Sequence, residues 1–256
     1  MKFLIIQVFV LCTCSLIYSA PIEDEERESI RKLIQRDLIL TPEQKQLLSN
    51  GGRDGRTGTL TLARRWPKIG NLVHVPYVIS PEFSPSEYKT IIDAKDQFHE
   101  YTCIRFVPRT NETDFLNIAP TNEGCYTYLG RIGGAQLVSL QKPSCVHHGV
   151  IIHELIHALG FAHMHSDYDR DRYVRINWNN IQFGAEDQFY AVHPDFFDHF
   201  NTPYDYDSIM HYDGKAFSRN GQYTIETYNP ADQNRIGQLE GFSRGDIHRI
   251  NNMYNC

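Results

Sequence analysis

The stretch that decides the fold reads His153-Glu154-Leu155-Ile156-His157-Ala158-Leu159-Gly160-Phe161-Ala162-His163. On a helix, His153 and His157 are one turn apart and point the same way, so that both imidazoles can bind one zinc ion. Gly160 can adopt a left-handed conformation, which ends the helix and lets the chain turn back. His163 can then supply a third ligand. Three neutral imidazoles leave one coordination position open for water, which is the arrangement of a catalytic zinc site.

Glu154 follows the first of these histidines and is not needed as a metal ligand. A zinc ion lowers the pKa of water to about 7 and can polarise a scissile carbonyl. Glu154 is placed to accept a proton from that water and to pass it to the leaving amine. The alternative is a buried structural helix with two hydrogen-bonded histidines, which is the usual false positive of the His-Glu-x-x-His pattern. The third histidine, placed behind a glycine, argues against that alternative.

A second segment, Ser208-Ile209-Met210-His211-Tyr212, contains two further candidates. A methionine beneath three histidines can form an apolar floor for a zinc site, and a tyrosine hydroxyl can reach the metal or a developing oxyanion. Outside such a context, Met210 is more often a core residue and Tyr212 a surface residue. Their assignment to the site therefore needs support from other parts of the sequence.

Composition excludes several classes of protein. The chain has 256 residues, 41% of them hydrophobic, with 25 basic and 31 acidic side chains and a net charge of −6. This length is enough for one sizeable core, or for two lobes that share a cleft. The composition is unlike that of a disulfide mini-scaffold, a coiled-coil rod or a low-complexity disordered chain. A net negative charge without a basic stripe argues against a nucleic-acid partner.

The N-terminal 56 residues differ from the rest. Residues 1–20 have a positive start, an apolar centre and small residues at the end, which predicts a secretory signal peptide. A membrane anchor is the alternative, but polar residues interrupt the apolar run. Residues 21–56 are rich in Glu, Arg and Lys and end in a flexible tract with arginines that a trypsin-like protease would cut easily. They predict a propeptide or, alternatively, a flexible extension.

Removal of the signal would take away two of the six cysteines. The four that remain are Cys103, Cys125, Cys145 and Cys256. An even number of cysteines in an exported chain suggests two disulfides, and their spacing alone allows three pairings. We therefore expect a secreted, extracellular protein without a membrane anchor.

Residues 57–256 are expected to form one folding unit of the α+β class. Strand-like patterns occur at residues 73–79, 104–107, 115–119 and 136–140. Pro76 places the first of these strands at a sheet edge. Helices are predicted over residues 85–100, 146–159 and 246–254, and Ser84-Pro85-Ser86-Glu87 is a capping box for the first. That helix has an apolar face made of Tyr88, Ile91, Ile92 and Phe98.

These residues together resemble those of the astacin-family metalloendopeptidases, within the metzincin group. Besides residues 153–163 and 208–212, the matches are Gly130-Arg131-Ile132-Gly133-Gly134, Asp169-Arg170-Asp171, Ala216-Phe217-Ser218, Ile236-Gly237-Gln238 and Tyr254-Asn255-Cys256. The resemblance implies an astacin-like zinc protease fold. In this fold, an N-terminal mixed sheet with the active-site helix faces an irregular C-terminal subdomain across a cleft. It also implies a secreted, monomeric endopeptidase with one Zn2+, which binds extended protein or peptide substrates in that cleft.

The resemblance assigns roles to individual side chains. The zinc ligands would be His153, His157, His163 and, as a fifth ligand, Tyr212. Tyr212 would swing away to stabilise the tetrahedral intermediate, while Glu154 would be the general base and Met210 the floor of the Met-turn. The disulfides would join Cys103 to Cys256 and Cys125 to Cys145. The strand at residues 136–140 would form the cleft edge and pair antiparallel with the substrate.

The N-terminal segment shares part of the family pattern. The Trp66-Pro67 pair implies that the catalytic domain starts at Thr57, after cleavage at Arg56. This divides the chain into a signal peptide (1–20), a propeptide (21–56) and a catalytic domain (57–256). Astacins usually carry Phe-x-Gly-Asp in the propeptide, and Ile34-Gln35-Arg36-Asp37 keeps only the aspartate. We expect the Asp37 carboxylate to ligate zinc and keep the zymogen latent, with Asp54 as the alternative.

Met164 departs from the family pattern, and Asn111 is a candidate glycosylation site. Astacins commonly have Glu after the third histidine, where it pairs with the new N-terminus, whereas this chain has Met164, which cannot form that ion pair. The only glycosylation sequon begins at Asn111 and predicts a surface turn, whether or not it is used. The alternative to a protease is a zinc-stabilised binding protein without turnover.

Overall fold

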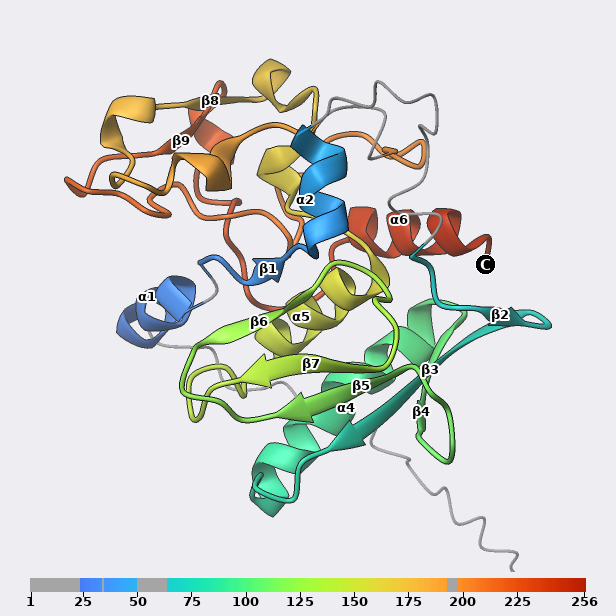
Figure 1. Ribbon diagram of the computed structural model, residues 1–256. Coiled ribbons are helices and arrows are strands. Elements are labelled where there is room, and N and C mark those ends of the chain that lie inside the picture. The colour runs from blue at the N-terminus through green and yellow to red at the C-terminus, as the bar shows by residue number, and fades with distance from the viewer. Residues whose placement is uncertain (1–23, 34, 50–63, 193–197) are drawn as a thin grey trace, which may run out of the picture.

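The computed structural model describes residues 24–33, 35–49, 64–192 and 198–256. Within them, seven strands form one sheet (Figure 1). In spatial order the strands are β1 (Leu38–Ile39), β6 (Cys125–Tyr128), β7 (Ala135–Leu140), β5 (Phe115–Ala119), β3 (Leu72–Ile79) and β2 (Lys68–Ile69), with β4 (Ile104–Pro108) paired to β3. The β2–β3 and β6–β7 pairs are antiparallel and the others are parallel, so the sheet is mixed, as expected.

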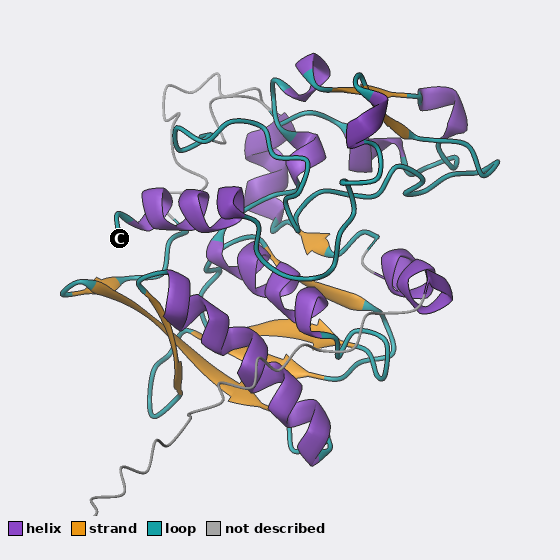
Figure 2. Ribbon diagram, turned by 180° about the vertical axis from the view of Figure 1, so that it is seen from behind, coloured by secondary structure: helices purple, strands orange, loops and turns teal. Residues whose placement is uncertain are grey.

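Two helices cover one face of this sheet (Figure 2). The first, α4 (Pro85–Tyr101), begins at the predicted capping box, in which Ser84 and Glu87 exchange hydrogen bonds. The second, α5 (His148–Leu159), is buried from Gly149 to Leu159 because it lies between the sheet and the C-terminal half. Gly160 ends α5 with φ of 108°, a left-handed conformation that glycine adopts without steric cost.

Pro76 does not lie in an edge strand, contrary to expectation. Strand β3 pairs with β4 on one side, and on the other with β2 near its start and β5 near its end. The Val73 N–H donates to the Cys103 carbonyl on the β4 side, whereas the Ser80 N–H donates to the Ile118 carbonyl on the β5 side. Backbone N–H groups of successive residues point to opposite sides of a strand, so position 76 faces the same side as position 80. The Pro76 nitrogen therefore points to the stretch between the end of the β2 pairing and the start of the β5 pairing. The ladder needs no N–H there, so proline is tolerated in an inner strand.

The apolar face of α4 also differs from the prediction in one residue. Ile91, Ala94 and Phe98 are fully buried, but Tyr88 is 47% exposed. Phe98 packs edge-on against Phe106 of β4, at a centroid distance of 5.1 Å. The helix therefore faces the sheet with positions 91, 94 and 98, and its first turn extends past the core.

The C-terminal half has little regular structure. Its described residues form a two-stranded sheet of β8 (Val174–Ile176) and β9 (Ile225–Thr227), the helix α6 (Arg244–Tyr254), and five short 3-10 helices: η1 (Met164–Ser166), η2 (Arg170–Arg172), η3 (Trp178–Asn180), η4 (Glu186–Phe189) and η5 (Pro230–Asp232). A second, smaller core around Phe189, Phe217 and Tyr212 supports these segments. Ser243 caps α6, as predicted.

The described part of the N-terminal segment packs against both halves. It consists of α1 (Asp24–Leu33), β1 and α2 (Pro42–Ser49), and Ile30 and Asp37 are fully buried. Thr41 and Gln44 form reciprocal side-chain-to-backbone hydrogen bonds at the predicted start of α2. The Gln44 side chain also donates to the Leu129 carbonyl. The predicted signal peptide, Asp54 and the Arg56–Thr57 boundary lie outside the described residues.

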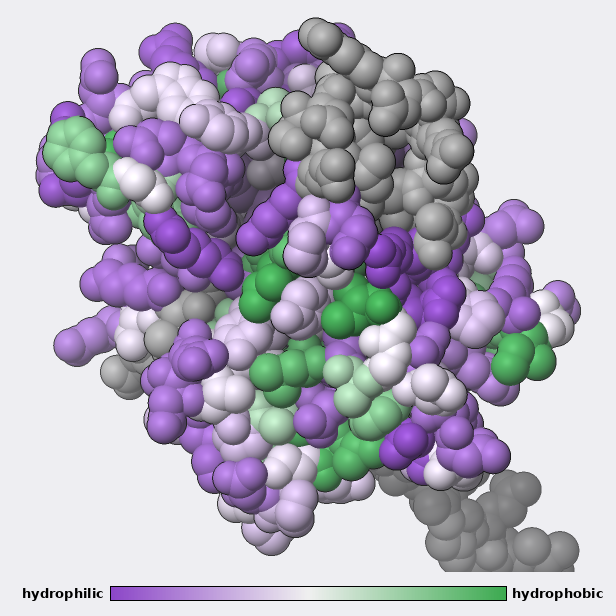
Figure 3. All heavy atoms as spheres, in the orientation of Figure 1, coloured by the Kyte–Doolittle hydropathy of each residue, from purple (hydrophilic) through white to green (hydrophobic). Residues whose placement is uncertain are grey.

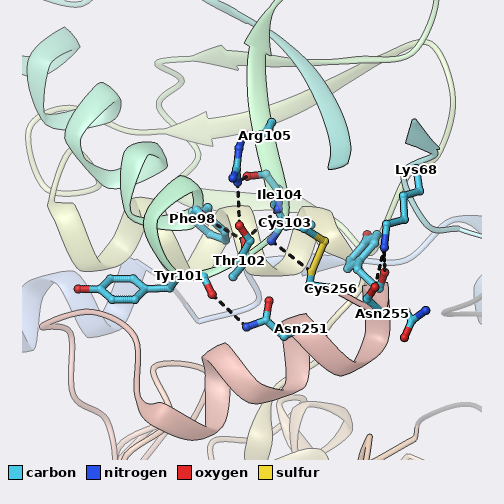
Figure 4. The surroundings of a disulfide bond; sticks show 11 residues. Lys68, Phe98, Tyr101, Thr102, Cys103, Ile104, Arg105, Asn251, Asn255 and Cys256 are labelled. Carbon is cyan, nitrogen blue, oxygen red and sulfur yellow. Dashed lines mark hydrogen bonds between the residues drawn. A yellow bond between two sulfur atoms is a disulfide. The ribbon is translucent and has the colours of Figure 1, made fainter. Parts of the chain in front are cut away.

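Two disulfides join the four cysteines, Cys103 to Cys256 and Cys125 to Cys145. The first ties α6 to the start of β4, where Asn251 also donates to the Tyr101 carbonyl (Figure 4). Across the described residues, no helix has the length and apolar character needed to cross a bilayer. Hydrophilic residues cover most of the face in Figure 3, and hydrophobic residues gather across its centre.

Candidate active site

Helix α5 positions two of the predicted ligands. His153 and His157 are buried, and their rings lie 4.7 Å apart between centroids. The Nδ1 atom of His153 lies 2.8 Å from the Ile209 carbonyl, and that of His157 lies 2.7 Å from the Phe161 carbonyl. Since a carbonyl only accepts hydrogen bonds, each Nδ1 carries the proton and each Nε2 is left as a lone-pair donor.

The third histidine arrives as the sequence predicts. After Gly160 the chain turns back, and the Nε2 atom of His163 lies 3.2 Å from the Nε2 atom of His157. Nitrogen ligands at 2.0–2.1 Å from a tetrahedral zinc ion are about 3.3 Å apart, so this separation fits shared coordination. The three imidazoles are neutral nitrogen donors in a buried site, which is the donor set of a catalytic zinc centre.

Glu154 and Tyr212 lie at the same centre. Both Glu154 carboxylate oxygens and the Tyr212 hydroxyl are buried, and none has a hydrogen-bond partner among the described residues. Burial, with a contribution from the charge of Asp37, raises the pKa of Glu154 well above its ordinary value and also raises that of Tyr212. Unpaired buried polar atoms are costly. Their presence here indicates groups kept for a water molecule, a metal or a substrate.

The Met-turn is held from α6. Asp246 accepts hydrogen bonds from the Ser208 hydroxyl and the Ile209 N–H, at 2.5 and 3.0 Å. Met210 is buried, and its carbonyl accepts from the Met164 N–H next to His163. These bonds connect the third ligand, the Met-turn and α6, and the Ile209 carbonyl contacts His153. Met210 and the histidines are therefore fixed in place by the same set of hydrogen bonds.

The Asp37 carboxylate reaches the three histidines from the N-terminal segment. Its Oδ2 atom lies 2.8 Å from the Nε2 atom of His153 and 3.7 Å from that of His157, and its Oδ1 atom lies 3.1 Å from that of His163. Asp37 and the histidines thus form one possible set of metal ligands.

The edge of the sheet at this site differs from the prediction. Strand β7 is an inner strand between β5 and β6, so the strand at residues 136–140 does not form the edge. The antiparallel partner β6 lies outside it, and β1 pairs in parallel with β6 through Leu38–Thr127 and Ile39–Tyr128. Without β1, β6 would be the edge strand. An extended peptide in the site would therefore pair with β6.

The structure brings most of the predicted site residues together. At one centre lie His153, His157, His163 and Asp37, with the Tyr212 ring 4.3 Å from that of His163. Glu154 is close enough for the charge of Asp37 to affect its pKa, and Met210 lies in the adjoining core. Asn111 lies apart, exposed next to the turn before β5. Asp246 and His165 were missed. The ring of His165 is buried and stacks on Tyr212 at 4.1 Å between centroids, and no local pattern marks either Asp246 or His165 as part of the site.

Comparison with known proteins agrees with this geometry. The astacin peptidase family matches residues 59–255. The low choriolytic enzyme of Oryzias latipes is 42% identical over 229 residues, which cover 89% of this chain and 80% of that enzyme. Zinc metalloproteinase nas-13 of Caenorhabditis elegans is 47% identical over 184 residues, and the match spans 71% of this chain but only 40% of nas-13.

A solved structure shows the same fold. High choriolytic enzyme 1, described as a hatching enzyme zinc-protease from the medaka fish Oryzias latipes, superposes with a TM-score of 0.71 at 48% sequence identity. The match covers 76% of this chain and 96% of that structure. The mixed sheet, the active-site helix and the irregular C-terminal half are therefore shared with a zinc protease of known structure.

Proposed function

The chain belongs to the astacin family of peptidases, and we propose that it is the zymogen of a secreted zinc endopeptidase that cleaves extracellular proteins. The observation that carries this proposal is the convergence of three histidines, the unpaired Glu154 carboxylate and the Asp37 carboxylate on one buried centre. In the zymogen, one acidic side chain from the N-terminal segment occupies the place that water and substrate need.

Each residue of the site has a chemical role. The three histidines hold one Zn2+, which when bound supplies a Lewis acid for a scissile carbonyl and for water. Glu154 accepts a proton from the attacking water and donates it to the leaving amine. Tyr212 is placed to donate a hydrogen bond to the developing oxyanion, because its hydroxyl is buried at the site and unpaired. Met210 forms the apolar floor beneath the histidines.

Latency would follow from Asp37 and end with proteolysis. Cleavage after Arg56 would release residues 21–56, expose β6 and start the mature domain at Thr57. The two disulfides fit an oxidising, extracellular location, and residues 1–20 would direct export. The substrate is proposed to be an extended segment of an extracellular protein. The names of two relatives, choriolytic enzymes, agree with activity outside the cell.

The first experiment tests the catalytic roles. Trypsin-treated protein should contain one zinc per chain and cleave casein, and phenanthroline should abolish cleavage. Glu154→Gln should lower kcat/KM at least about a hundredfold while zinc content and folding are kept, because only the general base is lost. A folded, zinc-loaded wild type without turnover would instead support the zinc-stabilised binding protein.

The second experiment tests latency. Before trypsin treatment, Asp37→Ala should cleave casein while the wild type does not, because the carboxylate no longer blocks the site. Asp54→Ala is the matched control and should remain latent. Activity of the Asp54 variant, with a silent Asp37 variant, would assign latency to Asp54. Arg56→Ala should resist activation by trypsin at this point of the chain.

A further inference from the structure

Arg36 is held in a conformation that is unfavourable for arginine. Its φ is +65°, the left-handed region that glycine adopts readily, and it directly precedes Asp37. A non-glycine residue keeps such a conformation only where its surroundings enforce it. Here the Asp37 carboxylate that follows is fixed among three histidines, and the Arg36 side chain contacts the C-terminal half.

Arg36 contacts two groups of the C-terminal half, and a carboxylate lies next to one of them. The Arg36 Nη2 atom donates to the Gly184 carbonyl at 2.5 Å, and its guanidinium carbon lies 6.0 Å from the centre of the Phe217 ring. The Glu186 carboxylate accepts from the Gly184 N–H at 2.8 Å, which places an acid beside the residue whose carbonyl Arg36 contacts. We call Gly184, Glu186 and Phe217 the cation wall.

All three groups of the cation wall attract a positive charge. A carbonyl oxygen and a carboxylate accept hydrogen bonds from a guanidinium or an ammonium, and the face of an aromatic ring attracts a cation. Within the described part of the chain, Glu186 forms no ion pair with Arg36 or with another Lys, Arg or His, and its carboxylate accepts from the Gly184 N–H. The wall also adjoins the site, since the rings of Phe217 and Tyr212 are 6.0 Å apart.

The direction of the N-terminal segment relates the wall to a substrate. Residues 38 and 39 run parallel to β6 and away from the histidines, so Arg36 lies on the other side of the centre from the β6-paired residues. A substrate that pairs antiparallel with β6 would run toward the histidines along this strand. Its β6-paired residues would precede the scissile bond, and the residue after that bond would take the place of Arg36.

We propose that the cation wall is a subsite that selects Arg or Lys at the position following the scissile bond. This inference rests on the proposed endopeptidase function and adds its substrate class. Arg36 occupies the subsite in the zymogen, and an acidic residue in its place would face Glu186 and be rejected. Because the contacts are partly open to solvent, the preference for Arg over Ala is expected to be about tenfold in kcat/KM.

The test compares peptides that differ only at the residue after the scissile bond: Arg, Lys, Ala or Glu. Activated wild type should cleave the Arg and Lys peptides about ten times more efficiently than the Ala peptide, and the Glu peptide least. Glu186→Gln and Phe217→Leu should each reduce the Arg-to-Ala ratio several-fold. Asp187→Asn removes the same charge one residue away, on an exposed side chain, and should leave the ratio unchanged.

A binding assay separates failure of this inference from failure of the proposed function. Calorimetry with the trypsin-activated Glu154→Gln enzyme and a synthetic peptide of residues 24–49 needs no turnover. The Arg36→Ala peptide should bind about tenfold more weakly, and this difference should shrink on the Glu154→Gln, Glu186→Gln double variant. Equal binding of both peptides, or an Arg-to-Ala cleavage ratio unchanged in Glu186→Gln and Phe217→Leu, would overturn the cation wall as a basic subsite.

Discussion

The sheet half and the C-terminal half place their parts of the zinc site by different means. In the sheet half, α5 carries His153, Glu154 and His157 on regular backbone hydrogen bonds and is buried along its length. In the C-terminal half, side chains take over this task. The Arg170 guanidinium, for example, donates to the carbonyls of His165 and Phe189, at 2.8 and 2.7 Å.

This difference determines which changes each half can tolerate. A helix packed on a sheet depends on many small apolar contacts, so one polar substitution at its rim costs little. An irregular segment depends on a few buried polar contacts, and removal of one leaves several groups unpaired. The third ligand and Tyr212 therefore depend on fewer, stronger contacts than His153 and His157 do.

The disulfides test how strongly the two halves depend on each other. Cys103–Cys256 closes a separation of 153 residues and ties α6 to the sheet half, whereas Cys125–Cys145 closes 20 residues within the sheet half. Chain entropy predicts a cost of about 5 kcal/mol for losing the first and about 3 kcal/mol for losing the second. Urea unfolding of the two paired Cys→Ser variants would measure both. Equal costs would mean that the sheet and α6 stay together without the bond.

Two fully buried phenylalanines compare the cores directly. Phe98→Ala in the sheet half should cost about 4 kcal/mol, because the rigid elements around it cannot close the cavity. Phe189→Ala removes the same atoms from the smaller core, whose loops can move inward, so its cost should be lower. Its effect on kcat should be larger, since Phe189 lies 5.8 Å from His165, which stacks on Tyr212. A greater loss of kcat in Phe98→Ala, at temperatures where both variants are folded, would contradict the comparison.

Matched capping boxes separate the halves most cleanly. Glu87 and Asp246 hold the same third position in their helices, but Asp246 also accepts from Ser208 and Ile209 of the Met-turn. Asp246→Ala should cost about 3 kcal/mol, because these buried donors lose their acceptor. Glu87→Ala should cost less and leave zinc affinity unchanged. Denaturation and zinc titration of both variants would show this, and equal effects on zinc affinity would refute a special role of Asp246.

Local signals predicted much of the sheet half and of the site. The capping box at Ser84, the histidine spacing on α5 and the glycine after it are each readable within a few residues. The three histidines meet as expected because Gly160 permits the turn that places His163. The family resemblance added Met210 and Tyr212, which no local pattern assigns.

The errors concern relations between distant segments. Pro76 and the strand at residues 136–140 were placed wrongly because whether a strand is an edge depends on its neighbours. Strand β6 is only four residues long, and its position follows from its pairing with β7 and β1. Asp246 lies 38 residues from Ser208, and nothing in its own helix indicates that contact. Side-chain contacts of this kind are what order the C-terminal half.

The smallest expected effect is the pH dependence of the stability that each capping acid contributes. This dependence should have opposite signs for Glu87 and Asp246. Backbone hydrogen bonding at Ser84 lowers the pKa of Glu87 from 4.5, so the unfolded chain binds its proton more readily. Stability from Glu87 should be present above about pH 4.5 and lost as the pH falls through the lowered pKa. Burial raises the pKa of Asp246 from 3.8, so the folded chain holds that proton more tightly. Its contribution should therefore decline as the pH rises from 3.8 through the raised pKa.

Subtraction of variants isolates these two slopes. The difference in the free energy of unfolding between wild type and Glu87→Gln should increase with pH across the acid range. The difference between wild type and Asp246→Asn should decrease over the same range. Both differences should be small beside the effects above, because each involves a single proton. Slopes of the same sign would mean that the two boxes have similar environments. Opposite slopes would show that the same four-residue motif is a solvated cap on the sheet half and a buried anchor for the Met-turn.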